Sequence, residues 1–198
     1  MPKRAARFRA CFTGREAEAI SQLVPPTQQL KATGFAANRQ QASAPELANY
    51  RRLHFATHGL ADNDNPALSA ILLSLVDEQG RAQDGMLRLQ DIYNLRLNAQ
   101  LVVISACQTA IGKEVRGEGL LSLSRGFLYA GSQRVISTLW KVEDRATSEL
   151  MSEFYQALLK PQTFSTAAAL RLAQRKLLAN PRWQAPRYWA AFIQQGDW

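Results

Sequence analysis

The chain has 198 residues, of which 46% are hydrophobic, and a formal net charge of +8. This length is enough to bury one sizeable core, so we expect a single domain over residues 1–198. An apolar run of about 18 residues and a signal-peptide core are both absent, which predicts a cytoplasmic protein with no membrane contact. Two cysteines are too few for a disulfide framework. The basic residues are scattered and not interleaved with aromatics, so nucleic acid is not the expected direct ligand.

Local patterns predict helices and strands along most of the chain. Apolar, β-rich runs such as "LVVISA" are typical of strands buried on both faces of a parallel sheet. Stretches with apolar residues three and four positions apart predict the helices that cover such a sheet. In chain order we predict a helix at 14–24, an irregular stretch at 25–43, a short helix at 45–50, a strand at 52–57, a β-hairpin within 65–89, a short helix at 89–95, a strand at 101–106, a helix at 117–131, a strand at 134–140, helices at 142–160 and 165–180, and a closing strand within 188–197.

The order of these elements predicts the fold class. The strands at 101–106 and 134–140 flank a helix that stops at Gly131, a residue suited to the end of a helix. This arrangement is a βαβ unit, whose crossover is right-handed and places the helix against one face of the sheet. We therefore predict an α/β fold in which a mostly parallel central sheet is flanked by helices.

Three residues follow two predicted strands at the point where each strand ends. Cys107 comes directly after the strand at 101–106, and His58 and Gly59 come directly after the strand at 52–57. If these strands are parallel neighbours, a thiol and an imidazole meet at the carboxyl edge of the sheet. An imidazole can take the proton of a thiol and return it to a leaving amine. The backbone N–H groups of Gly59 and Cys107 could hold the oxyanion of a tetrahedral intermediate.

Packing alone offers a second interpretation of the same residues. Cysteine is among the most buried residue types, and a histidine inside a strand, such as His54, is expected to be a hydrogen-bonded core residue. His54 and His58 are four apart but lie in a strand pattern, which is not a metal motif. Phosphate-binding and dinucleotide-binding loops are absent, so we expect no cofactor and no metal. Cys11 lies in a poorly patterned segment and is expected to be inert.

Several motifs in sequence order resemble one family. The segments "HFATHGL", "NPALSAILLS", "LVVISACQTAIG" and "YWAAFI" are similar to CHAT domains, which are caspase-like cysteine peptidases related to caspases, separases and gingipains. The resemblance implies a caspase-like three-layer sandwich and a catalytic dyad of His58 and Cys107. These residues are 49 positions apart, in agreement with the roughly 50 between histidine and cysteine in caspases.

The resemblance also implies a substrate-binding residue. In separase-like relatives an acidic residue beyond the strand after the catalytic cysteine receives a basic P1 side chain, and here Asp144 occupies such a place beside Glu143. A carboxylate would suit a P1 arginine. The alternative is that these two residues only form the acidic start of a helix, stabilised by the helix dipole.

Two departures from the family pattern leave more than one function open. Residues 1–13 retain little of the family's usual first strand, which is expected to be truncated or atypical here. CHAT domains are commonly joined to tetratricopeptide repeats, and such repeats are absent from this sequence, so any regulation would come from another protein or from sequence outside these 198 residues. The first hypothesis is a cysteine endopeptidase that acts on a protein or peptide substrate. The others are a catalytically silent protein-interaction module and, last, a basic accessory protein associated with nucleic acid.

Overall fold

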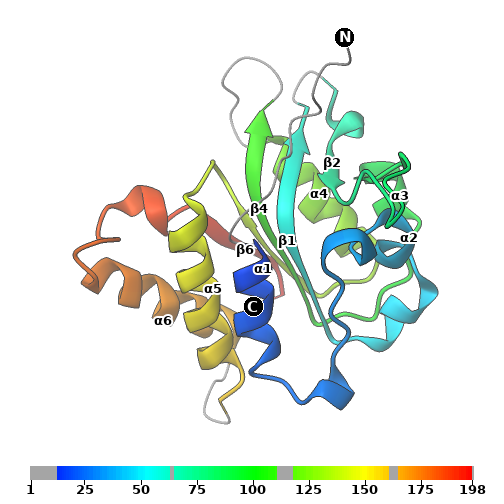
Figure 1. The fold of residues 1–198 in the computed structure, drawn as a ribbon. Coiled ribbons are helices and arrows are strands. Elements are labelled where there is room, and N and C mark those ends of the chain that lie inside the picture. Colours follow the sequence, from blue (N-terminus) through cyan, green and yellow to red (C-terminus); the bar gives the residue numbers. More distant parts are fainter. Residues whose placement is uncertain (1–12, 63–64, 111–117, 161–164, 198) are drawn as a thin grey trace.

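The computed structural model describes residues 13–62, 65–110, 118–160 and 165–197, and every structural statement below concerns these residues. A six-stranded sheet has the strand order β3-β2-β1-β4-β5-β6 (Figure 1). The strands are β1 (Arg52–Ala61), β2 (Ala70–Leu72), β3 (Met86–Arg88), β4 (Leu101–Ala110), β5 (Arg134–Thr138) and β6 (Phe192–Gly196). The expectations for residues 1–12, including Cys11, lie outside the described part of the chain.

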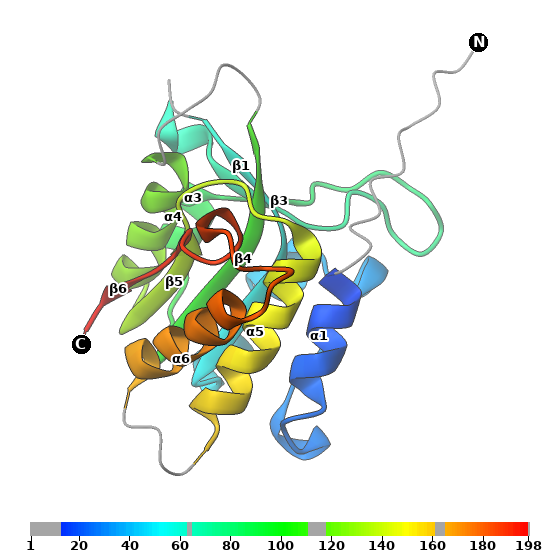
Figure 2. The same cartoon turned by 90° about the vertical axis from the view of Figure 1, so that its left-hand side faces the viewer.

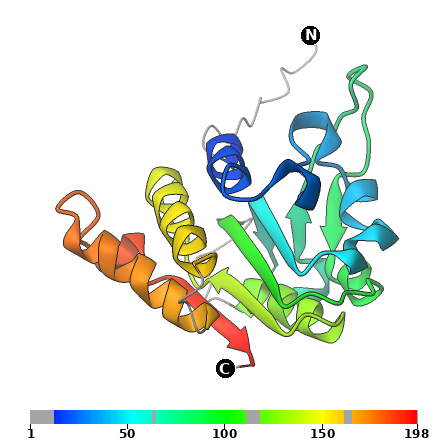
Figure 3. The ribbon, with the colours of Figure 1, turned by 90° about the horizontal axis from the view of Figure 1, so that it is seen from below.

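Helices cover both faces of this sheet. The α-helices are α1 (Thr13–Ser21), α2 (Arg39–Ala42), α3 (Leu89–Tyr93), α4 (Glu118–Tyr129), α5 (Asp144–Leu158) and α6 (Thr166–Ala179). Short 3-10 helices occupy Pro26–Gln28, Gly34–Ala36, Pro45–Asn49, Pro66–Leu68 and Pro186–Tyr188. Seen from below in Figure 3, α1, α5 and α6 lie on one side of the sheet and α3 and α4 on the other. The predicted α/β sandwich is confirmed, and none of the helices in the described ranges is long and apolar enough to cross a membrane.

Alternate residues of β4 explain why its sequence is almost continuously apolar. Val102 and Ile104 belong to the core beneath α3 and α4, whereas Leu101 and Val103 belong to the core beneath α5 and α6. All four are at most 1% exposed. A strand covered on both faces needs apolar side chains in both directions, so it shows no polar alternation. The run "LVVI" is therefore the centre of the molecule.

The sheet is less parallel than predicted. β1 pairs in parallel with β4, and β4 with β5, but β2, β3 and β6 each pair antiparallel with a neighbour. The expectation of a mostly parallel sheet therefore holds only for the three central strands. The difference arises partly because the predicted hairpin, now β2 and β3, joins the edge of the sheet, and the two strands of a hairpin pair antiparallel.

Several predicted element ends also differ from the structure. The first two predicted strands continue four residues further, to Ala61 and Ala110, and the third ends at Thr138 instead of residue 140. α4 ends at Tyr129, two residues before the predicted stop at Gly131. Gly131 follows it with φ of 109°, and a Cβ at this position would overlap the carbonyl oxygen of Leu97. Only glycine fits both the backbone angle and the close contact.

Candidate functional site

β1 and β4 bring the two predicted dyad residues side by side. The strands pair in parallel and in continuous register from Arg52↔Leu101 to Ala61↔Ala110, and within this ladder His58 is the direct partner of Cys107. Both residues therefore lie inside their strands, three residues before the end, and not just beyond the ends as the sequence predicted. The strands are longer than predicted because backbone pairing between β1 and β4 extends each strand past its last apolar residue. The side chain of Cys107 lies outside the described part of the structure.

The imidazole of His58 is partly buried and incompletely paired. Its Nδ1 atom is buried and has no hydrogen-bond partner. Two hydroxyl oxygens share this condition, Oγ of Ser105 and Oγ1 of Thr147, and each of these residues is 3% exposed. Buried polar atoms without a partner are rare in folded proteins and cost free energy. Each of these atoms can therefore still form a hydrogen bond with a bound water molecule or a ligand.

Gly59 follows His58 within β1 and is buried. Its register partners are Gln108 in β4 and Ile71 in β2, so the strand has a neighbour on each side at this position. The predicted role of its N–H group in holding an oxyanion is not tested by this placement and stays a prediction.

His54 has the hydrogen-bonded, structural environment that the sequence indicated for it. Its Nε2 atom lies 2.8 Å from Oε1 of Glu16 in α1, and its Nδ1 atom lies 3.1 Å from the hydroxyl oxygen of Tyr155 in α5. A carboxylate only accepts hydrogen bonds, so in the neutral ring Nε2–H donates to Glu16 and Nδ1 accepts from Tyr155. Burial raises the pKa of the Tyr155 hydroxyl well above its ordinary value, and the negative charge of Glu16 raises it further.

This three-residue network ties two helices to the sheet. Glu16 and Tyr155 are each 3% exposed, and the His54 side chain is 14% exposed. The rings of His54 and Tyr155 also pack edge to face, with centroids 5.4 Å apart. α1, α5 and β1 therefore meet at one buried polar contact. The sequence could not reveal it, because the partners of His54 lie 38 and 101 positions away along the chain.

The two acidic residues at the start of α5 differ in their roles. Glu143 is the N-cap, and its Oε2 accepts a hydrogen bond from the backbone N–H of Ala146 at 2.7 Å. Asp144 is the first residue of the helix and is half-buried. The helix-start interpretation is therefore correct for Glu143. The position of Asp144 leaves its predicted contact with a substrate untested.

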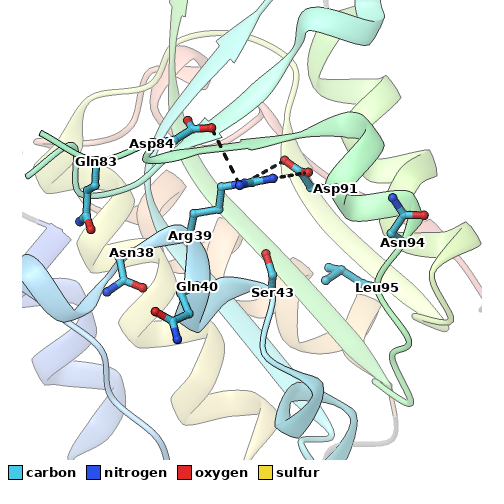
Figure 4. Close-up of a pocket in the computed structure, with 9 residues that line it drawn as sticks. All are labelled: Asn38, Arg39, Gln40, Ser43, Gln83, Asp84, Asp91, Asn94 and Leu95. Carbon is cyan, nitrogen blue, oxygen red and sulfur yellow. Dashed lines mark hydrogen bonds and ion pairs between the residues drawn. The ribbon is translucent and has the colours of Figure 1, made fainter.

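A separate polar cavity of about 410 Å³ lies between α2, the loop before β3 and α3 (Figure 4). Arg39 spans the cavity. Its guanidinium donates bidentate hydrogen bonds to the Asp91 carboxylate, from Nε at 3.2 Å and from Nη2 at 2.7 Å, and its Nη1 forms a 3.9 Å ion pair with Oδ2 of Asp84. Partial burial alone would raise the pKa of Asp91, but the hydrogen bonds and charge of Arg39 hold it below its ordinary value. Neither His58 nor Asp144 lines this cavity. No sequence pattern predicted this cavity, because its walls come from three separate segments.

Comparisons with known proteins identify two relatives and a family. Tetratricopeptide repeat protein 28 of Mus musculus is 36% identical over 112 residues, which are 57% of this chain and 4% of that protein. Its counterpart in Homo sapiens is 32% identical over 115 residues, which are 58% of this chain and 4% of that protein. The chain thus matches only a small part of these relatives. The CHAT domain family matches residues 4–197, which is nearly the entire sequence, and the chain therefore belongs to the CHAT domain family, whose fold is caspase-like.

Proposed function

We propose that this CHAT domain is a cysteine endopeptidase in which His58 and Cys107 form the catalytic dyad. One observation carries the proposal, namely the direct register pairing of these two residues in adjacent parallel strands. The proposal requires the imidazole and the thiol to share one face of the sheet, which is the arrangement expected of directly paired positions in a parallel ladder. An imidazole and a thiol on adjacent positions of one face are the pair that cysteine-dependent acyl transfer requires.

In the proposed reaction the Cys107 thiol transfers its proton to His58, and the thiolate sulfur bonds to the carbonyl carbon of the scissile peptide. When the tetrahedral intermediate collapses, the carbon–nitrogen bond breaks and His58 returns the proton to the departing amine. A water molecule then hydrolyses the thioester and restores the thiol. The backbone N–H groups of Gly59 and Cys107 are the proposed oxyanion donors, each contributing on the order of 2.7–4 kcal/mol to lowering the barrier.

The proposed substrate preference is for a basic P1 residue that contacts Asp144. Asp144 follows β5, the strand next to β4, so it lies beyond the same carboxyl edge of the sheet toward which His58 and Cys107 lie. Exchanging Asp144 for Asn would remove the charge and nearly keep the shape. We expect kcat/KM for arginyl and lysyl substrates to fall about 10- to 150-fold, because a hydrogen bond between charged groups contributes roughly 1.5–3 kcal/mol. Substrates with a neutral P1 residue should hardly change, and equal losses for both would contradict the assignment.

Glu143→Gln is the matched control for this experiment. A glutamine side chain keeps an oxygen that can accept from the N–H of Ala146, so the N-cap of α5 is preserved while one negative charge is removed. If Asp144 contacts the P1 side chain, Glu143→Gln leaves the ratio of kcat/KM between basic and neutral P1 substrates unchanged. A similar change of that ratio in both variants would indicate a general effect of charge near the helix start.

A second function has its own support. The curated relatives are named as tetratricopeptide repeat proteins, and the matched segment is 4% of their length. Such repeats are known as partner-binding arrays. In this alternative the domain is a catalytically silent caspase-like module that contacts a tetratricopeptide-repeat or other regulatory protein. The same partner would be the regulator if the domain is a peptidase.

Covalent labelling separates the two functions. The folded protein is incubated with a peptidyl-arginyl electrophile, and the modified residue is identified by mass spectrometry. The peptidase proposal expects one adduct on Cys107, no adduct in Cys107→Ala, and much slower labelling in His58→Ala at an unchanged circular dichroism spectrum. If the wild-type chain is folded but Cys107 reacts no faster than a free cysteine, the peptidase proposal fails and the interaction module takes its place.

A further inference from the structure

Four side-chain atoms in the described residues are buried without a hydrogen-bond partner, and three of them, Nδ1 of His58, Oγ of Ser105 and Oγ1 of Thr147, have no explanation in the site described so far. The fourth is Oε1 of Gln194 in β6. The first three come from β1, β4 and α5. Together they would represent a considerable loss of free energy if each remained unpaired, since one such group costs roughly 1–3 kcal/mol. The register of the strands and the periodicity of the helix indicate how these three residues lie relative to one another.

β1 and β4 present two of these groups on the same face. His54 contacts α1 and α5, so the even-numbered positions of β1 face these helices, and His58 is the second such position after His54. In β4, Leu101 and Val103 pack in the core beneath α5, so Ser105 is the next position on that face. The ladder is continuous and has no bulge between these positions, and Ser105 pairs with Ala56, two residues before His58. His58 and Ser105 are therefore diagonal neighbours on one face.

α5 carries the third polar group, the hydroxyl of Thr147, and its position along the sheet can be compared with that of His58. Thr147, Met151 and Tyr155 follow one another at intervals of four residues, and all three are buried, so they form one stripe of the helix. Tyr155 meets His54, and α5 runs back along the sheet in the direction opposite to β1 (Figure 2). From Tyr155 to Thr147 the helix rises about 12 Å. From His54 to His58 the strand advances about 13 Å. From these lengths we infer that Thr147 lies at the level of His58, as Tyr155 lies at the level of His54.

We propose that His58, Ser105 and Thr147 together bind one buried water molecule, and that this water positions the His58 imidazole. This inference rests on the proposed function, because positioning matters only if His58 acts on Cys107. A tyrosine reaches His54 directly, but a threonine side chain is several ångströms shorter, so one water molecule completes the corresponding contact to His58. Buried waters typically make about three hydrogen bonds to polar groups that have no other partner. Three such groups are present.

The proposal includes the direction of the hydrogen bonds around this water. Water and hydroxyl groups can each donate or accept, so the direction follows from the proposed function, in which Nε2 of His58 must accept the thiol proton. The water oxygen then accepts from Nδ1–H of His58, and its two hydrogens are donated to the hydroxyl oxygens of Ser105 and Thr147. The neutral ring then carries its proton on Nδ1, and the lone pair of Nε2 is free to take the thiol proton of Cys107. His54 is held in the opposite tautomer, because its Nε2–H donates to Glu16. The only two histidines of the chain are thus expected to differ in tautomer.

Two-bond ¹H–¹⁵N NMR spectra test this difference without any substrate. At a pH where both rings are neutral, wild type should show one ring with its proton on Nδ1 and one with its proton on Nε2, and His58→Gln assigns the signals. In Thr147→Val and in Ser105→Ala the His58 signal should shift toward the Nε2–H form, while the His54 signal stays. Thr147→Ser should restore the wild-type spectrum. Met151→Leu, on the same stripe of α5, is the control and should change neither signal.

The kinetic effect is read separately. If the chain is a peptidase, Thr147→Val should lower kcat roughly 10-fold at nearly constant KM, the loss expected for one hydrogen bond that orients a catalytic group. A His58 tautomer that is the same in wild type, Thr147→Val and Ser105→Ala, with folding confirmed by a thermal melt, overturns the inference. A tautomer shift in a chain that cleaves nothing supports the water site and refutes only the peptidase function.

Discussion

Replacing His54 by alanine tests the buried network between α1, β1 and α5. The change removes both hydrogen bonds of the imidazole and leaves the Glu16 carboxylate and the Tyr155 hydroxyl buried, each residue being 3% exposed. The two groups together should cost roughly 3–5 kcal/mol, because a buried polar group that loses its hydrogen-bond partner costs roughly 1–3 kcal/mol, and more when it is charged. In a domain of this size each kcal/mol lowers Tm by roughly 2–4 °C, so we expect a decrease of roughly 6–20 °C.

Urea unfolding at neutral pH, followed by far-UV circular dichroism, measures this loss. We expect a lower midpoint with little change in the slope, because His54→Ala alters stability and not the surface exposed on unfolding. Glu16→Gln is the companion variant. Its amide oxygen can still accept from Nε2–H of His54, so it should cost only about 1 kcal/mol. A loss below about 1 kcal/mol for His54→Ala would refute the reasoning, since it would mean that water reaches Glu16.

Three further results are expected. Iodoacetamide at low concentration should alkylate Cys107 before Cys11 in the folded protein, and mass spectrometry of the peptides would show the reverse if the assignment of the reactive thiol is wrong. Asp91→Asn should destabilise the fold by about 1 kcal/mol at neutral pH, after allowance for the exposure of Arg39. Because the pKa of Asp91 is lowered in the folded state, its contribution is present above the ordinary aspartate pKa and lost as pH falls, so wild type and variant should converge in acid. Gly131→Ala should cost about 2–4 kcal/mol in a thermal or urea melt, since φ of 109° and a close carbonyl oxygen both disfavour a Cβ, and a neutral effect would contradict the observed turn.

The sequence predicted those parts of the fold that depend on local composition. The run from Leu101 to Ile104 and the helical stripes had clear patterns, and the polar turn within residues 65–89 correctly indicated the hairpin. The predicted strand ends at 57 and 106 were too early, because pairing between β1 and β4 extends the strands through residues that have no strand pattern of their own. Such pairing depends on a partner distant in sequence and leaves no local signal.

In the candidate site, too, features with a local sequence pattern were predicted, and contacts between distant segments were not. His58 and Cys107 were predicted from their places after apolar runs, and their register was not predictable because it depends on how two distant strands align. His54 was expected to be a hydrogen-bonded core residue, but neither Glu16 nor Tyr155 could be named as its partner. The polar cavity around Arg39 was missed altogether, because three separate segments form it only after folding.

The ladder between β1 and β4 has a consequence for the order of folding. Each of its register pairs joins residues 49 positions apart. None of these pairs can form until the segment between them, which contains the hairpin and α3, has closed into a loop. The entropy of closing that loop must be overcome before the contacts it permits can compensate for it, and parallel pairing of distant strands is accordingly slow. His58 and Cys107 thus become neighbours only after this loop has closed. In an unfolded chain the two residues are separate, so any reaction that needs both imidazole and thiol depends on the pairing of β1 with β4.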